Sequence, residues 1–238
     1  MMEFFFKPKS VAVIGASSKQ GKLGYVCLKN IINCDFSGDI YPVNPKADVV
    51  QGLRAYHSLL DVPGDVDLAV FLISAKFAVA TMEACVRKGV KAVIIQSMGF
   101  KEVGGEGKVI EEKIVEIAKD NNIRVIGPNC SGIVSRNIAT TIYPMEAEIP
   151  NGNVVLIGQS GLLAAGMASV GISANLDFLT GPFSFQDHYA TTDLSRESRV
   201  LKGLGSGLCL SKYGLLVKRF PCCGSAHKSL DGFLHLRE

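Results

Sequence analysis

Short apolar runs, each followed by a small polar turn and then a helical pattern, recur along this chain. The first run, Val11–Ile14, consists of β-branched residues and one alanine, which is typical of a strand buried on both faces. A spacing of about thirty residues between such runs predicts βαβ units, and therefore a parallel α/β sheet covered by helices on both sides. The expected strands are residues 10–14, 39–43, 67–73, 90–95 and 123–126, and the expected helices start at 23, 77 and 107.

Ligands of such sheets bind outside the carboxyl ends of the strands, so the turns there carry the functional information. Gly15 ends the first run, and the small polar turn Ala16–Gly21 leads into a helix. Free N–H groups and the positive end of a helix dipole favour a phosphate at such a turn. The turn lacks the spacing of the dinucleotide fingerprint, because Ala-Ser-Ser follows Gly15. We therefore expect a phosphate-bearing nucleotide.

The turn after the second strand narrows the class of nucleotide. An enzyme that binds NAD carries an acidic residue here, which holds the ribose hydroxyl. This chain has Asn44-Pro45-Lys46 instead, and a lysine favours an additional phosphate on the ribose. The pattern therefore indicates coenzyme A or NADP rather than NAD.

A second strand–turn–helix unit follows a turn-rich linker around Tyr143–Gly152. Residues 153–157 form another apolar run, and Gly158-Gln159-Ser160-Gly161 follows it as a second anion-binding turn. The domains expected are residues 1–147 and 151–238.

Composition excludes several classes of function. The chain has 25 basic and 22 acidic residues, a net charge of +3, and no basic tract of the kind that binds nucleic acid or membranes. We expect neither a secretion signal nor a membrane span. The cysteines are odd in number and mostly lie in apolar segments, which indicates reduced core thiols and a cytoplasmic protein. No zinc site is expected from Cys222, Cys223, His227 and His235, because a second Cys-x-x-Cys pair is missing.

Five segments, in order, resemble the CoA-binding (α) part of the nucleoside-diphosphate-forming acyl-CoA synthetases. The resemblance is to ADP-forming acetate–CoA ligases and, more distantly, to the α subunit of succinyl-CoA synthetase. The segments are residues 10–17, Tyr41-Pro-Val-Asn-Pro-Lys46, Gly99-Phe-Lys-Glu102, Ile126-Gly-Pro-Asn-Cys-Ser-Gly132 and Gly158-Gln-Ser-Gly161. The resemblance implies a Rossmann-like doubly wound domain that binds CoA, followed by an incomplete flavodoxin-like domain.

The resemblance also implies roles for individual residues. Residues Ser17 to Gln20 would lie against the CoA phosphates, Lys46 at the phosphorylated ribose, residues 96–98 beside the pantetheine, and the Gly-Pro-Asn-Cys loop at the thiol. The cofactor-binding candidates are Gly15, Ser17, Ser18, Lys19, Gln20, Asn44, Lys46, Ser74, Gln96, Ser97, Met98, Pro128, Asn129 and Cys130, and the phosphate-binding candidates are Gln159, Ser160 and Gly161. Cys130 is interpreted as a small loop residue rather than as a nucleophile, because no histidine lies near it in sequence.

The reaction implied is the interconversion of acyl-CoA, ADP and phosphate with acid, CoA and ATP, through an acyl phosphate and a phosphohistidine. ATP, ADP and magnesium would be bound only by an ATP-grasp β subunit or domain, so we expect a hetero-oligomer. No phosphohistidine is identifiable: His227, in Gly224-Ser-Ala-His-Lys, only faintly matches the family's loop.

Two features leave other readings open. Residues from about 174 onward lose the βαβ rhythm, so that they are either a divergent end of the second domain or the product of a change of reading frame. Without its histidine loop, the chain would be a non-catalytic CoA-binding module. A third reading is an NAD(P)-dependent oxidoreductase or redox sensor on the same fold.

Overall fold

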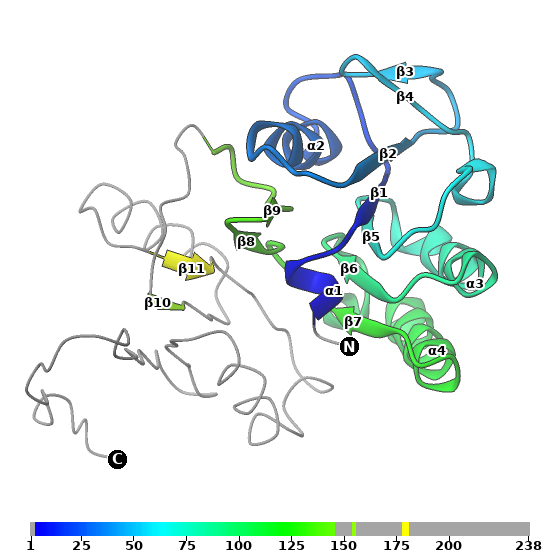
Figure 1. Cartoon of the computed structure of the whole chain (residues 1–238). Coiled ribbons are helices and arrows are strands. Elements are labelled where there is room, and N and C mark those ends of the chain that lie inside the picture. The colour runs from blue at the N-terminus through cyan, green and yellow to red at the C-terminus, as the bar shows by residue number, and fades with distance from the viewer. Residues whose placement is uncertain (1–2, 146–153, 156–177, 181–238) are drawn as a thin grey trace, which may run out of the picture.

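Five parallel strands form the main sheet of the computed structural model, which describes residues 3–145, 154–155 and 178–180 (Figure 1). Their order across the sheet is β2-β1-β5-β6-β7, and every neighbouring pair is parallel. The strands are β1 (Ser10–Ile14), β2 (Asp39–Val43), β5 (Leu68–Phe71), β6 (Ala92–Ile95) and β7 (Arg124–Ile126). The order runs outward in both directions from β1 and β5, so the expected doubly wound α/β sheet is confirmed.

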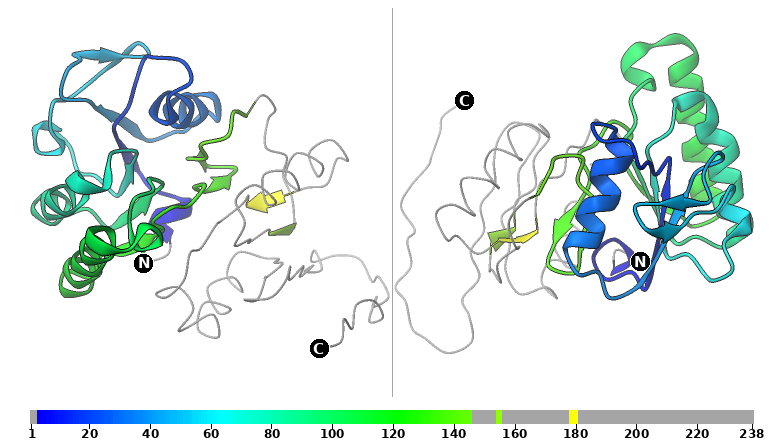
Figure 2. Two further views of the ribbon diagram at one scale, coloured as in Figure 1. Left: turned by 180° about the vertical axis from the view of Figure 1, so that it is seen from behind. Right: turned by 90° about the horizontal axis from the view of Figure 1, so that it is seen from above.

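Helices cover both faces of this sheet, as Figure 2 shows from above. Helix α2 (Leu23–Asn33) lies on one face, and α3 (Ala78–Lys88) and α4 (Gly105–Asp120) lie on the other. Helix α3 ends at Gly89, whose φ of 77° is the left-handed conformation that glycine adopts readily at a helix C-terminus. None of the described helices is both long and apolar enough to cross a membrane.

Alternate residues of each strand point into two separate hydrophobic cores. In β1, Val11 and Val13 pack with α2, whereas Ala12 and Ile14 pack on the side of α3 and α4. All five residues of β1 are buried, as are all residues of β5 and β6. This double burial explains why these strands read as unbroken apolar runs in the sequence.

Several short elements were not expected. Helix α1 (Glu3–Phe6) precedes β1 and buries Phe5. The hairpin β3 (Val49–Val50) and β4 (Leu53–Arg54) follows β2. Single 3-10 turns occur at Leu59–Asp61, Ala75–Phe77 and Lys101–Val103.

A second, smaller sheet has the order β10-β11-β8-β9. The hairpin β8 (Val134–Ser135) and β9 (Ile138–Ala139) pairs through Ser135 with Thr180 of β11 (Phe178–Thr180), which in turn pairs in parallel with β10 (Val154–Val155). β10 lies inside the strand expected at residues 153–157. The expected division at residues 147–151 stays a prediction, and the rest of the chain beyond Met145 lies outside the described residues.

Candidate functional site

The loop after β1 and the start of α2 lie against each other because two glycines allow it. A Cβ atom on Gly24 of α2 would lie 2.0 Å from the carbonyl oxygen of Gly15. Gly15 itself has φ of 93°, and a Cβ on it would lie 2.5 Å from the carbonyl oxygen of Leu72, just after β5. Glycine is therefore required at both positions, and the loop sits where the strand order reverses.

The exposed part of this loop presents polar groups at the N-terminus of α2. The hydroxyl of Ser17 accepts a hydrogen bond of 3.0 Å from the backbone N–H of Lys19. Ser18, Lys19 and Gln20 are exposed, and the side chain of Lys22, the residue before α2, makes no capping hydrogen bond. An uncapped helix start with cationic side chains beside it suits an anionic group.

Asn44 connects the loop after β2 to the loop after β1. Its Nδ2 donates to the carbonyl oxygen of Ala16 at 2.8 Å, and its Oδ1 accepts from the backbone N–H of Lys46 at 2.8 Å. The exposed Lys46 is thereby held on a backbone that is tied to the Ser17 loop. The structure thus brings together the two segments for which phosphate contacts were predicted.

Gln51 is a residue of this edge that the sequence analysis missed. It lies at the turn of the β3–β4 hairpin, and its Nε2 donates to the carbonyl oxygens of Ser17 and Tyr25, both at 3.0 Å. Its backbone N–H donates to the hydroxyl of Ser18 at 3.3 Å. The only sequence signal for it is the dipeptide Gln51-Gly52 between apolar residues, a weak hairpin signature.

The loops after β5, β6 and β7 are also linked to one another. The hydroxyl of Ser97 donates to the carbonyl oxygen of Phe71 at 3.3 Å, and the backbone N–H of Asn129 donates to the carbonyl oxygen of Ser97 at 3.0 Å. Ser74 is exposed directly before the 3-10 turn at Ala75, and Met98 is 69% exposed. The loops at all five strand ends therefore form one connected edge.

Gln96 is buried rather than lining an open surface. It is 2% exposed, and its Nε2 donates to the carbonyl oxygen of Thr140. That carbonyl fixes the orientation of the amide, and Oε1 is left buried without a hydrogen-bond partner. An unsatisfied buried acceptor of this kind is uncommon in folded proteins.

Cys130 is also buried, in the loop that contains the cis peptide bond Gly127–Pro128 and the left-handed Asn129. Its Sγ donates to the carbonyl oxygen of Ile95 at 3.3 Å. Burial raises the pKa of this thiol to about 12. Because the thiolate is the reactive form, a nucleophilic role at neutral pH is disfavoured.

Glu102, which follows the β6 loop, is a turn-stabilising residue in this structure. Its carboxylate accepts hydrogen bonds from the backbone N–H groups of Gly99, at 2.7 Å, and Phe100, at 3.2 Å. Within the described ranges no group of three or more potential metal ligands occurs. The candidates Gln159, Ser160, Gly161 and His227 lie outside the described residues.

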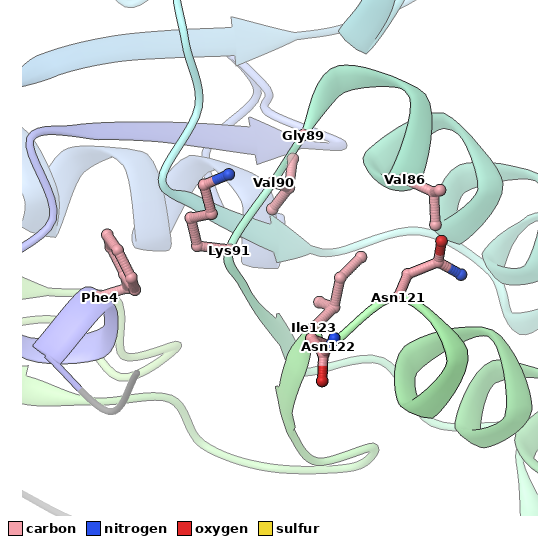
Figure 3. A pocket seen from close by; sticks show the side chains of 8 residues that line it. All are labelled: Phe4, Val86, Gly89, Val90, Lys91, Asn121, Asn122 and Ile123. Carbon is pink, nitrogen blue, oxygen red and sulfur yellow. The ribbon is translucent and has the colours of Figure 1, made fainter.

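A pocket of about 310 Å³ lies at the opposite, amino-terminal edge of the sheet. Figure 3 shows Phe4 of α1 on one side of it, Val86 and Asn121 on the other, and Ile123 between them. Its lining is mostly apolar and amide, and Lys91 is its one charged residue. None of the predicted site residues lines it.

Known proteins resemble the chain over most of its length. A family described as a CoA binding domain matches residues 9–136. The α subunit of the ADP-forming acetate–CoA ligase II of Pyrococcus furiosus is 42% identical over 194 residues, which cover 75% of this chain and 42% of that protein. The ADP-forming acetate–CoA ligase of Methanocaldococcus jannaschii is 42% identical over 177 residues, which cover 74% of this chain and 25% of that protein.

A solved structure agrees with this result. The dinucleotide-forming acetyl-coenzyme A synthetase 1 of Ca. Korarchaeum cryptofilum, in complex with phosphate and ADP, superimposes with a TM-score of 0.72 and 33% identity, over 77% of this chain and 39% of that chain. This chain therefore spans less than half the length of each of these three proteins.

Proposed function

This chain belongs to the CoA binding domain family, and on that premise we propose that it binds coenzyme A as part of an ADP-forming acyl-CoA ligase. The resemblance of its motifs to the CoA-binding part of nucleoside-diphosphate-forming acyl-CoA synthetases is confirmed by relatives that are 42% identical. The observation that carries the proposal is the connected edge of five loops, with the backbone of the exposed Lys46 tied through Asn44 to the loop Ala16–Gly21.

The residues of this edge fit the parts of coenzyme A. The uncapped start of α2 and residues 17–20 suit its diphosphate, and the cation of Lys46 suits the phosphate on its ribose. Residues 96–98 would lie beside the pantetheine arm, through the half-buried Ser97 and the exposed Met98, and the loop Pro128–Cys130 would lie at the thiol. The remaining candidates, Gly15 and Ser74, shape and border the same edge. Bound coenzyme A would supply the thiol that carries the acyl group.

The proposed reaction involves a second, nucleotide-binding subunit or domain. The proposed reaction interconverts acyl-CoA, ADP and phosphate with acid, CoA and ATP, through an acyl phosphate and a phosphohistidine. Nucleotide and magnesium would be bound by an ATP-grasp β subunit or domain, in a cytoplasmic hetero-oligomer. The relative from P. furiosus is the α subunit of an ADP-forming acetate–CoA ligase, and this supports a division of the enzyme into subunits.

Binding measurements with the purified chain test the proposal. We expect calorimetric titration to show binding of coenzyme A and weaker binding of dephospho-CoA. Lys46→Met should weaken the binding of coenzyme A by about tenfold, the loss expected for one charge-assisted contact, and should leave dephospho-CoA nearly unaffected. Lys113→Met, on the exposed face of α4, is the matched control.

Two outcomes would contradict the proposal. The first is the absence of any binding of coenzyme A to the unsubstituted chain. The second is displacement of coenzyme A by NADH or NADPH at similar concentrations, which would support the dinucleotide reading instead.

A further inference from the structure

The turn of the β3–β4 hairpin contacts the loop Ala16–Gly21 through Gln51. The side-chain amide of Gln51 donates to two carbonyl oxygens, that of Ser17 in the loop and that of Tyr25 in the first turn of α2, each at 3.0 Å. One amide group therefore fixes the loop relative to the helix start. A third hydrogen bond, from the backbone N–H of Gln51 to the hydroxyl of Ser18, joins the two segments again.

This third hydrogen bond also has a consequence for the chemistry of Ser18. A hydroxyl group has one proton to donate and lone pairs that accept. Since the oxygen of Ser18 accepts from Gln51, its own proton is left to donate to another acceptor. Ser18 is exposed, so that acceptor can be an anionic oxygen of a bound ligand.

The conformation of the turn indicates that glutamine is not there for the sake of the hairpin. Gln51 and Gly52 have φ of 51° and 82°, and they connect the paired residues Val50 and Leu53. Positive φ at both central residues defines a two-residue turn that prefers Asn-Gly. Asparagine would suit the backbone better, but its side chain is one methylene shorter than the amide that spans Ser17 and Tyr25.

We propose that Gln51 is a positioning residue that preorganises residues 17–22 for the diphosphate of coenzyme A. This inference rests on the proposed function. The segment 44–51 then has two tasks: Lys46 provides the cation for the phosphate on the ribose, and Gln51 holds the loop that receives the diphosphate. The two contributions differ in their ligand dependence, because dephospho-CoA retains the diphosphate and lacks the phosphate on the ribose.

The variant Gln51→Asn separates this role from a structural one. Asparagine suits the backbone conformation of the turn better than glutamine, so thermal stability should be unchanged or higher. Its shorter side chain cannot donate to the carbonyl oxygens of both Ser17 and Tyr25. The affinity for coenzyme A and for dephospho-CoA should nevertheless fall by the same factor, about tenfold, from the loss of preorganisation. Gln51→Glu, which keeps the length and replaces the donor by an acceptor, should weaken both ligands at least as much. Val49→Thr, an exposed change on β3, is the control.

Hydrogen exchange of the unliganded chain provides a readout that does not depend on binding. Residues 17–26 should exchange faster in Gln51→Asn than in the unsubstituted protein, whereas β5 and β6 should not change. Unaltered affinity and unaltered exchange in Gln51→Asn would overturn the assignment of Gln51. A lack of coenzyme A binding by the unsubstituted chain would instead overturn the proposed function.

Discussion

Burial determines the chemistry of Cys130. The residue lies in a loop of the candidate site, where an exposed thiol would be a candidate nucleophile. In this structure it is 3% exposed, and desolvation favours its neutral form. Cys27 and Cys85 are buried in the same way, and desolvation raises the pKa of each. The described thiols at these three positions therefore contribute to packing.

The raised pKa of Cys130 predicts a loss of stability in alkaline solution. Below pH 9 the thiol is protonated in both the folded and the unfolded chain, so its contribution does not change with pH. Between pH 9 and about 12 only the unfolded chain releases the proton, so the free energy of unfolding falls as the pH rises. Urea unfolding should show this fall, and Cys130→Ser should reduce its slope by up to about 1.4 kcal/mol per pH unit.

Alkylation provides an independent check of the same prediction. Iodoacetamide at pH 8 should modify the half-buried Cys34 in the native chain and leave Cys130 unmodified. Modification of native Cys130 at the rate of Cys34, or an unchanged slope in Cys130→Ser, would contradict the structural interpretation.

Site residues that directly follow a strand could be predicted from the sequence. A site residue whose hydrogen-bond partners are distant in sequence could not. Ser17, Lys46 and Asn129 follow predicted strands, and the structure places them on one connected edge. Their contacts with coenzyme A stay predictions. Gln51 was missed because its partners lie 26 to 34 positions away, a relation set by the hairpin's packing and not by any local pattern.

At the scale of elements, the loop after β1 and helix α2 approach each other closely. Glycine in the interior of a helix normally weakens it by about 1 kcal/mol relative to alanine. Gly24 lies in the first turn of α2, and alanine is excluded there because a Cβ would overlap the carbonyl oxygen of Gly15. The position of the whole helix relative to the loop therefore depends on the absence of one methyl group.

This dependence predicts losses of different size for two nearby glycines. Gly24→Ala should destabilise the chain by about 3 kcal/mol, because backbone atoms on both sides must move apart. Gly21→Ala, where open space surrounds the position and only a φ of 79° is strained, should cost about 1 kcal/mol. Chemical denaturation measures both, and equal losses for the two variants would contradict the close approach.

Element prediction succeeded for the five strands of the main sheet and failed for the short elements. Strands β1 and β2 begin and end at the predicted residues, and β5, β6 and β7 are one to three residues shorter. The hairpin β3–β4 was missed because two-residue strands are too short to show an alternating pattern. Of the 3-10 turn Ala75–Phe77, only Phe77 was included in the predicted helix, which was expected to start one residue before α3.

At the scale of the molecule, residues 141–145 complete the unit that contains the main sheet. Asn30 of α2 is buried, and its Nδ2 donates to the carbonyl oxygens of Thr141 and Tyr143, both at 2.8 Å. Its Oδ1 accepts from the backbone N–H of Met145 at 3.2 Å. Ile133, which directly precedes β8, and Ile138 of β9 pack into the hydrophobic core that contains the buried face of α2.

These contacts predict that a chain ending at Ala147 folds by itself. It should unfold in one cooperative transition and bind coenzyme A as the full chain does, because it retains every described residue of the candidate edge. It would lose β10, β11 and the pairing of Ser135 with Thr180. Circular dichroism and calorimetry test this, and a loss of cooperative unfolding would show that the second sheet is needed for the first domain.

The parallel direction of all five main strands has a practical consequence. Helix α1 borders the pocket at the amino-terminal edge, beside the starts of β6 and β7 (Figures 1 and 3). The polar loops lie at the other ends of the same strands. A chain attached to a sensor surface through α1 would therefore present these loops to the solution, where coenzyme A can reach them.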